Sequence, residues 1–198
     1  MQPLPLVSAA EYLVMERSCR EKHEYFAGEV FAMGGATESH NLLTANVVGG
    51  LWTQLRGRPC RVYPSDLRVL VSETGLYTYP DVVVVCGEPR FLDATRDTLL
   101  NPTLVVEVLS PSSEACDRGR KFEHYRKVPS LLEYVLVAQD AVRGEHYLRR
   151  DDGTWVYAEA SGLEKSVALT SIQCTVSLAD LYDNVNDLPL APSPPAPP

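Results

Sequence analysis

Two short aliphatic runs constrain the fold of this chain most, because each of them holds an acidic residue. Asp81 follows Pro80 at the head of the run Val82–Cys86. Glu107 lies inside a second run, residues 103–109. The density of β-branched residues in both runs is typical of strands that are covered on both faces. A carboxylate in such a strand is costly to remove from water, so each acid needs a cation or hydrogen-bond donors as partners.

Two interpretations fit this pair of acids. In the first, each carboxylate is a structural group that an arginine or backbone amides satisfy. In the second, the two acids share one metal ion, because adjacent strands lie about 4.8 Å apart and side chains on one face can share a cation. The segment that follows Glu107 favours the second interpretation.

The residues that follow, 110–127, predict a helix rich in basic side chains. Serines and a proline end the strand and begin this helix. Lys121 and Tyr125 share one helical face, whereas Phe122 is expected to face the core. Lys121 is therefore expected to reach over the end of the strand, where it can orient an attacking water or offset charge on a phosphate.

Together these strings resemble the Uma-type restriction-endonuclease-like proteins of bacteria, which belong to the PD-(D/E)XK nuclease superfamily. The resemblance extends from about Ala9 to Asp183, and its most specific parts are Pro80-Asp81 and residues 107–112, 117–125 and 129–134. It implies an α/β (α+β) fold, in which a mixed central sheet is flanked by helices and carries an added antiparallel hairpin.

For the site, the resemblance implies that Asp81 and Glu107 bind a divalent cation and that a lysine helps to activate water. The superfamily places this lysine two residues after the glutamate, but Leu109 occupies that position here. In the Uma-type branch the lysine lies on the following helix, which implies this role for Lys121. Uma-type proteins also tend to carry a histidine where the long helix begins, which adds His40 to the candidate site.

Length and composition favour one compact domain with a substantial core. The chain has 198 residues, of which 45% are hydrophobic, so a single domain is expected over residues 1–188. Residues 189–198 are dominated by proline and are expected to form a disordered tail. The five cysteines are scattered singly, which favours a reducing compartment and argues against structural zinc. A soluble cytoplasmic protein without membrane contact is expected, because no apolar run approaches membrane-spanning length.

The net charge of −8 argues against indiscriminate nucleic-acid binding, because phosphate contacts need basic side chains. Two basic clusters nevertheless stand out: Arg56, Arg58, Arg61 and Arg68, and Arg118, Arg120, Lys121, Arg126 and Lys127. They are either solvated faces or, if both flank the two acids, binding surfaces for a phosphate-bearing substrate.

Periodicity predicts the remaining elements. Helices are expected over residues 9–20, 38–56 and 177–182. Hairpins are expected over residues 22–33, over 60–72 with 77–86, and over 143–148 with 154–159. A strand at 133–138 is expected to follow the basic helix through a right-handed crossover.

Three residues have open roles. Glu29, on the first hairpin, is expected either to add a carboxylate to the metal site or to lie on the surface beside a turn. Asp66 is expected either to face Asp81 across the central hairpin or to pair with Arg68. His40 belongs either to the site or to a structural hydrogen bond, which is the commoner role of a lone histidine.

The residues and the resemblance support one leading hypothesis, a metal-dependent endonuclease that hydrolyses DNA phosphodiester bonds. In this hypothesis Asp81, Glu107 and the main-chain carbonyl of Val108 hold Mg²⁺ or Mn²⁺. Lys121 orients the water or stabilises transition-state charge, and Tyr125 assists by hydrogen bonding. A homodimer is expected, because a duplex has two strands to cut.

The alternative hypothesis is a descendant of the nuclease fold that binds nucleic acid or a protein partner without cutting. Leu109 and the acidic net charge favour it. Hydrolysis of RNA or another phosphoester is a further alternative, which the same acids can serve. No Gly-x-Gly-x-x-Gly, phosphate-loop or Gly-x-Ser-x-Gly motif occurs, so nucleotide-cofactor enzymes and serine hydrolases lack support.

Overall fold

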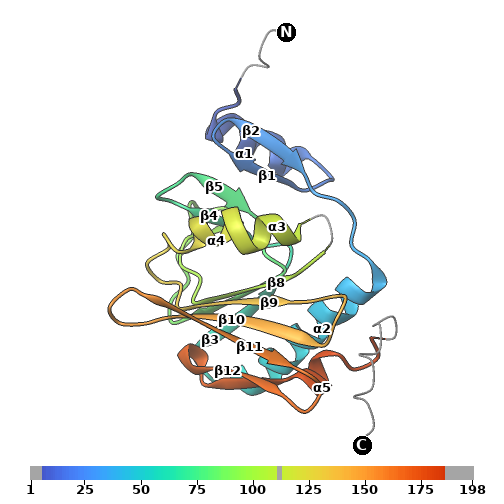
Figure 1. Cartoon of the computed structure of the whole chain (residues 1–198). Helices are drawn as coiled ribbons and strands as arrows, with labels where there is room; N and C mark the ends of the chain where they lie inside the picture. The colour runs from blue at the N-terminus through green and yellow to red at the C-terminus, as the bar shows by residue number, and fades with distance from the viewer. Residues whose placement is uncertain (1–5, 111–112, 186–198) are drawn as a thin grey trace, which may run out of the picture.

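A computed structural model describes residues 6–110 and 113–185, and its strands form three sheets (Figure 1). The six-stranded sheet has the order β11-β10-β9-β8-β6-β3. Its strands are β3 (Cys60–Pro64), β6 (Val82–Cys86), β8 (Leu104–Val108), β9 (Glu133–Val137), β10 (Arg143–Arg149) and β11 (Trp155–Ser161). The five-stranded sheet has the order β2-β1-β5-β4-β7. Its strands are β1 (His23–Phe26), β2 (Glu29–Ala32), β4 (Arg68–Val71), β5 (Leu76–Thr78) and β7 (Thr98–Leu99).

The helices and a C-terminal hairpin complete the fold. The hairpin consists of β12 (Ser166–Leu169) and β13 (Cys174–Ser177). The longer helices are α1 (Ala9–Ser18) and α2 (Glu38–Leu55), and the short ones are η2 (Thr170–Ile172) and α5 (Leu178–Leu181). One continuous helical segment, called helix 114–125 below, consists of α3 (Glu114–Cys116), the π turn η1 (Asp117–Lys121) and α4 (Phe122–Tyr125).

The six-stranded sheet is mixed, as the fold-class prediction requires. Strand β8 is parallel to β9, whereas β6 is antiparallel to both β8 and β3. Strands β10 and β11 form the predicted antiparallel hairpin, with β11 at the edge of the sheet. The expectation of an α+β architecture with a mixed sheet flanked by helices is therefore confirmed.

Side chains of the central strands alternate between two hydrophobic cores, because successive residues of a strand point to opposite faces. Val82, Val84 and Val106 pack in the core that includes α2, the C-terminal hairpin and α5. Val83, Val85 and Val105 pack in the other core, which includes residues of helix 114–125 and the loop after it. Figure 1 shows these layers on opposite sides of the six-stranded sheet. Both acid-bearing runs are thus covered on both faces.

The predicted central hairpin is divided between the two sheets. Residues 60–72 form β3 in one sheet and β4 in the other, and residues 77–86 form β5 and β6 in the same way. Pro64 ends β3 and Pro80 lies between β5 and β6, and neither proline can donate to a strand ladder. Asp81 therefore lies where the chain passes from one sheet to the other.

The helix predictions hold, with small shifts at the ends. The helix α1 ends at Ser18 instead of Arg20, and Ser8 and Glu11 form a capping box at its start. The helix α2 ends at Leu55 and keeps its helical course through its two central glycines. The predicted capping serine, Ser177, accepts a hydrogen bond at the start of α5.

A disulfide corrects the interpretation of the cysteines. Cys60 and Cys86 are directly opposite each other in the antiparallel β3–β6 pair, and their sulfur atoms are bonded. The other three cysteines have free thiols. The scattered positions of the cysteines in the sequence do not reveal this disulfide, because the pairing of β3 with β6 brings Cys60 and Cys86 together. The positions are therefore no guide to the redox compartment.

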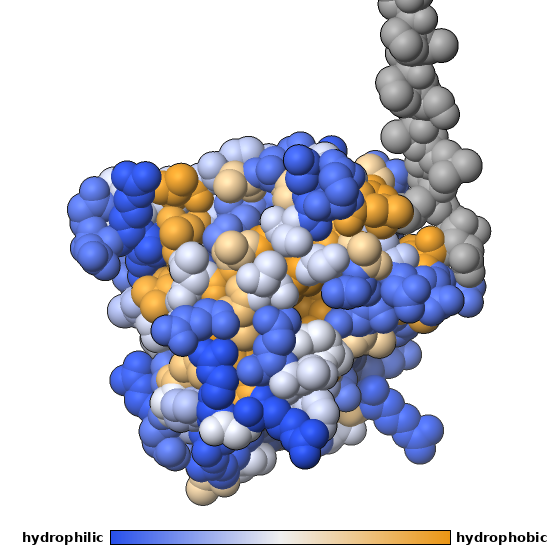
Figure 2. Space-filling view, turned by 90° about the horizontal axis from the view of Figure 1, so that it is seen from below, coloured by the Kyte–Doolittle hydropathy of each residue, from blue (hydrophilic) through white to orange (hydrophobic). Residues whose placement is uncertain are grey.

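The exterior is mixed in character. Figure 2 views the molecule from the side of α2 and the C-terminal hairpin, where hydrophilic residues dominate and smaller hydrophobic areas lie between them. Within residues 6–110 and 113–185, no helix has the length and apolar character needed to cross a bilayer. The predicted proline-rich tail, residues 189–198, lies outside the described residues.

Candidate functional site

A cleft of about 820 Å³ opens where β6 begins and β8 ends. The five-stranded sheet, the start of α2 and helix 114–125 all contribute to its walls. Polar side chains of the lining include Glu24, His40, Asp81, Glu107, Lys121 and Gln139. The cleft therefore gathers residues that are distant in the sequence.

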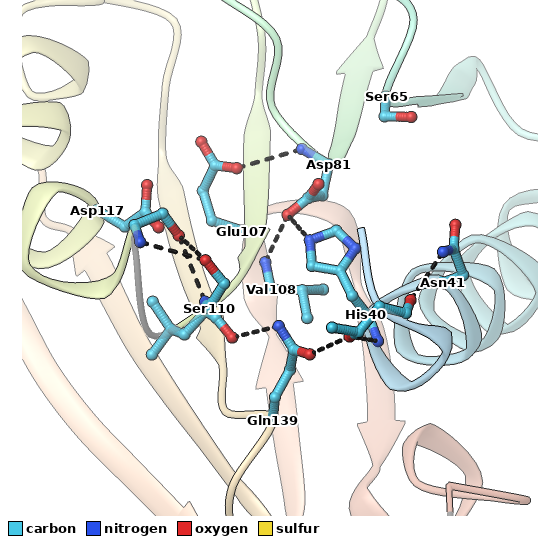
Figure 3. Close-up of polar contacts among 12 residues, drawn as sticks. His40, Asn41, Ser65, Asp81, Glu107, Val108, Ser110, Asp117 and Gln139 are labelled. Atoms are coloured by element: carbon cyan, nitrogen blue, oxygen red, sulfur yellow. Dashed lines mark hydrogen bonds and ion pairs between the residues drawn. The ribbon is translucent and has the colours of Figure 1, made fainter. Parts of the chain in front are cut away.

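Asp81 and Glu107 are fixed against each other through the main chain (Figure 3). The backbone N–H of Asp81 donates to Oε2 of Glu107 over 3.2 Å, and the backbone N–H of Val108 donates to Oδ2 of Asp81 over 2.7 Å. The antiparallel register of β6 and β8, which places Val82 opposite Val106, puts the two acids side by side. Glu107 is buried, whereas Asp81 is partly exposed to the cleft.

Lys121 and Tyr125 both contact Glu107, as their helical spacing predicts. The Tyr125 hydroxyl donates to Oε1 of Glu107 over 2.9 Å, and Nζ of Lys121 lies 3.5 Å from the same oxygen. Lys121 is the last residue of the π turn, a local widening that is frequent at functional sites. Phe122 points away and packs against Tyr134, as expected.

The ammonium of Lys121 is surrounded by carboxylates. Besides Glu107, its Nζ lies 3.0 Å from Glu24 and 3.2 Å from Asp117. Burial alone lowers the pKa of Lys121, but the three acids together raise the pKa well above its ordinary value. Lys121 therefore keeps its positive charge in the cleft.

Glu107 experiences the opposite balance. Burial raises the pKa of Glu107 well above its ordinary value, and the negative charges of Asp117, Asp81 and Glu24 add to this effect. Lys121 opposes the increase without cancelling it. Acidic side chains thus outnumber the ammonium of Lys121 in this centre, and the raised pKa of Glu107 reflects their mutual repulsion.

This centre fits a divalent metal ion in charge and in donor chemistry. Mg²⁺ and Mn²⁺ prefer oxygen ligands, and Mg²⁺ usually keeps several waters beside one or two protein carboxylates. Within the described residues, no three His, Cys, Asp or Glu side chains are grouped closely enough to form a ready-made metal cage. Asp81 and Glu107 would therefore supply a small part of the ligand set, with water and substrate oxygens supplying the rest.

A ring of hydrogen bonds and one close side-chain contact joins His40 to this centre (Figure 3). Nε2 of His40 lies 3.2 Å from Oδ2 of Asp81. The backbone N–H of His40 donates to the Thr37 hydroxyl, which donates to Oε1 of Gln139 over 2.7 Å. Nε2 of Gln139 donates to the carbonyl of Leu109 over 2.7 Å. We call this closed set, which returns to Asp81 through Val108 N–H, the Gln139 ring.

Asp66 is not part of the site, and both expectations for it are wrong. It lies in the turn between β3 and β4, its side chain is 89% exposed, and it pairs with Lys22 instead of Arg68. Pro64 ends β3 and leaves Asp66 beyond the ladder. Glu29 is exposed on β2 and does not line the cleft, so its surface role is the one observed.

The two basic clusters do not flank the acids. Of their nine residues, only Lys121 lines the cleft. Arg58 donates to the carbonyl of Ile172, and Arg118 pairs with Glu145. The basic residues at the cleft rim are instead Arg20 and Lys22.

Three residues of the site were absent from the sequence-based candidates: Glu24, Asp117 and Gln139. Asp117 had a signal, because it precedes Lys121 by one helical turn. The sequence signal for Gln139 was weaker: Gln139 follows β9, which pairs in parallel with β8, and parallel strands end at the same sheet edge. Glu24 had no sequence signal beyond its place on a hairpin, because its partner Lys121 is distant in the sequence.

The sequence model of the Uma2 family, described as "Putative restriction endonuclease", matches residues 9–179. Two proteins of Synechocystis sp., both named uncharacterized, are also similar. Protein sll1609 is 39% identical over 157 residues, which cover 79% of this chain and 89% of that protein. Protein slr1290 is 42% identical over 172 residues, which cover 85% of this chain and 90% of that protein.

Among solved structures, the chain is similar to "a putative nuclease belonging to DUF820" from Anabaena variabilis. The TM-score is 0.72 at 17% identity, and the alignment covers 92% of this chain and 99% of that chain. At this identity the likeness concerns the fold alone. The match to the family model is what decides membership: the chain belongs to the Uma2 family of restriction-endonuclease-like proteins.

Proposed function

We propose that this protein is a metal-dependent endonuclease that hydrolyses phosphodiester bonds of DNA. The observation that carries the proposal is the contact of Glu107 with both Asp81 and Lys121 where β6 begins and β8 ends. Two carboxylates and one ammonium at a strand end are what metal-assisted phosphodiester hydrolysis needs. The family description and the nuclease-like fold support the same reaction class.

In this proposal Asp81, Glu107 and the main-chain carbonyl of Val108 hold Mg²⁺ or Mn²⁺. When bound, the cation polarises the scissile phosphate and lowers the pKa of a bound water. The excess of acidic side chains around Glu107 favours binding of such a cation, because the cation would relieve their mutual repulsion. His40, through Asp81, keeps this carboxylate oriented toward the cleft.

Lys121 acts as a hydrogen-bond donor and a positive charge, since its raised pKa keeps it protonated. It can orient the attacking water or stabilise the charge that builds on the phosphate, but it does not accept the proton of that water. The hydroxyl of Tyr125, whose pKa burial raises well above its usual value, stays neutral and donates to Glu107. Tyr125 thereby fixes the orientation of the Glu107 carboxylate.

The proposal is tested by titrating Mn²⁺ into the metal-free protein in a calorimeter and by measuring cleavage of supercoiled plasmid DNA. Glu107→Gln is expected to lose both metal binding and cleavage. Lys121→Ala is expected to retain metal binding, while cleavage falls about 10²–10³-fold, as when one group that stabilises transition-state charge is removed. Lys127→Ala is the matched control, because Lys127 is exposed and pairs with Glu73 outside the cleft.

Full cleavage by Lys121→Ala would refute the role of this lysine. Equal Mn²⁺ binding by the wild type and by Glu107→Gln, with neither protein cutting DNA, would favour the non-catalytic binding protein. The buried Leu109 at the superfamily's lysine position is the observation that keeps this second candidate in view. Cleavage of RNA in preference to DNA would redirect the substrate assignment without changing the roles of the acids.

A further inference from the structure

One wall of the cleft is the β1–β2 hairpin, and its residues alternate between two environments. Glu24 and Phe31 are directly opposite each other in the antiparallel pair, so their side chains share one face of the hairpin. Both line the cleft. Tyr25 and Val30 point to the opposite face, where they pack in the small core beneath α1.

Glu24 anchors this wall to the proposed catalytic centre. Its Oε1 lies 3.0 Å from Nζ of Lys121 and accepts a hydrogen bond from the Thr78 hydroxyl over 2.5 Å. The face of the hairpin that carries Phe31 is therefore held beside the proposed metal ligands, and it is not a free surface loop.

Phe31 is 42% exposed, although it lines the same cleft as the buried acids. The cleft is also open at Gly34 and Gly35, which line it, because a Cβ atom added there would meet no atom within 4 Å. The rim next to the hairpin carries Arg20 and Lys22. The ammonium of Lys22 pairs with the exposed Asp66 over 3.1 Å, a surface ion pair that a phosphate can replace at little cost. The cleft thus brings together an exposed aromatic ring, two cations at its rim and the proposed centre for phosphodiester hydrolysis.

The groups of a nucleic acid that match an exposed phenyl ring are the faces of its bases. In a duplex these faces are covered by their stacked neighbours, whereas the bases of a single strand can stack on aromatic side chains. The backbone of the same strand would run past the two rim cations toward the acids. An aromatic wall at the scissile site therefore selects an unpaired base.

We propose that Phe31 is a base-stacking site and that the cleft takes a single-stranded or locally unpaired segment of nucleic acid. This inference rests on the proposed nuclease function and names its substrate class. Phe31 binds the base next to the scissile phosphate, and Arg20 and Lys22 bind neighbouring phosphates. The site is a specificity element for strand state, since the ring recognises every base by its π-face.

The test uses fluorescence anisotropy with a short labelled single-stranded oligonucleotide and with its duplex, in buffer that contains Ca²⁺. Phe31→Ala is expected to bind the single strand roughly 5- to 100-fold more weakly than the wild type, as loss of one base–aromatic stack predicts. Phe31→Trp should restore binding, whereas Phe31→Leu, which keeps apolar bulk without a π-face, should not. Duplex binding should be weaker than single-strand binding and unchanged by all three substitutions.

Trp52→Ala is the matched control, because Trp52 is 56% exposed on α2 and does not line the cleft. Single-strand affinity should be unchanged in this variant. A second probe replaces single nucleotides by abasic sites. An abasic site at one position of the oligonucleotide should weaken its binding to the wild type and should not weaken its binding to Phe31→Ala any further. This result would place the missing base on Phe31. Circular dichroism checks that each variant keeps its fold.

Equal affinity of the wild type and Phe31→Ala for the single strand would overturn the stacking site. Cleavage of DNA by the wild type would still support the proposed function in that case. Preference of the wild type for the duplex would overturn the assignment of substrate class. If the wild type bound neither form and cut neither the single-stranded oligonucleotide nor plasmid DNA, the proposed function and the stacking site would both be rejected.

Discussion

Two buried polar regions of this molecule balance their charges in opposite ways. The first, called the Arg68 network here, joins Glu16 and Arg17 of α1 to Arg68, Tyr79 and Asp97. Arg68 lies 3.1 Å from Asp97 and donates to the Tyr79 hydroxyl over 2.8 Å, and Arg17 lies 2.8 Å from Asp97. The second is the cleft centre, where Lys121 alone faces Glu24, Glu107 and Asp117.

The pKa values of the acids report this difference. Hydrogen bonds from Arg17, together with the charge of Arg68, lower the pKa of Asp97 to about 2. Burial and neighbouring acids raise the pKa of Glu107. An acid held in a polar network is therefore not by itself a sign of function. A surplus of acids that the protein leaves unbalanced is the more informative feature, because strongly perturbed pKa values cluster at functional sites.

The largest effect is expected from removing Arg68. The side chain of Arg68 is 3% exposed, and breaking a buried ion pair leaves an uncompensated charge, which costs about 3–5 kcal/mol. Arg68→Met should lower the free energy of unfolding by this amount in urea denaturation at neutral pH. Lys127→Met removes an exposed pair and should cost about 0–1 kcal/mol. Equal losses in the two variants would mean that the Arg68 network does not stabilise the fold.

A smaller loss is expected from Asp97→Asn. The lowered pKa corresponds to about 2 kcal/mol, which we reduce to about 1–2 kcal/mol because the Asp97 side chain is 30% exposed. A depressed pKa stabilises the folded state above the unfolded value of 3.8, and this contribution is lost as the pH falls toward about 2. Urea denaturation should therefore separate wild type and variant at pH 7 and bring them together near pH 2.

The smallest effect, with the opposite pH dependence, is expected from Glu107→Gln in metal-free protein. Because the folded pKa of Glu107 is raised, protonation stabilises the folded state fully below 4.5, and this contribution is lost as the pH rises through the folded value. In urea denaturation, the free energy of unfolding of the wild type should fall as the pH rises from 4.5. The free energy of unfolding of Glu107→Gln should fall less over the same range. At neutral pH the two should differ by about 1 kcal/mol or less. If Glu107→Gln lowered the free energy of unfolding as much as Arg68→Met does, Glu107 would be a structural residue like Arg68.

Much of the fold was predictable because its signals are local. The apolar density around Asp81 and Glu107 predicts strands covered on both faces, and the hydrophobic cores on each side of the sheet confirm this. The helical spacing of Lys121 and Tyr125 predicts a shared face, which the contacts with Glu107 confirm.

Most of the failures share one cause, because they concern partners that are distant in the sequence. The Cys60–Cys86 bond depends on the register of two strands. The contact between Thr37 and Gln139 spans 102 positions, and no local pattern encodes it. The basic clusters were conspicuous in the sequence, yet most of their side chains contact structural partners such as Ile172 and Glu145. Strand and helix periodicity place a residue on a face, but they do not say which element that face will meet.

The Gln139 ring has a consequence for the order of folding. Its hydrogen bonds span separations of 102, 30 and 27 residues, and contacts between distant positions form late, since long loops must close before any contact compensates the lost entropy. The ring can close only after α2 has docked on the sheet and β6, β8 and β9 have aligned. The cleft is thus expected to be assembled among the last parts of the molecule and to open early under stress. The state of the cleft would then report whether the whole chain has folded, and it would change before any spectroscopic signal of secondary structure.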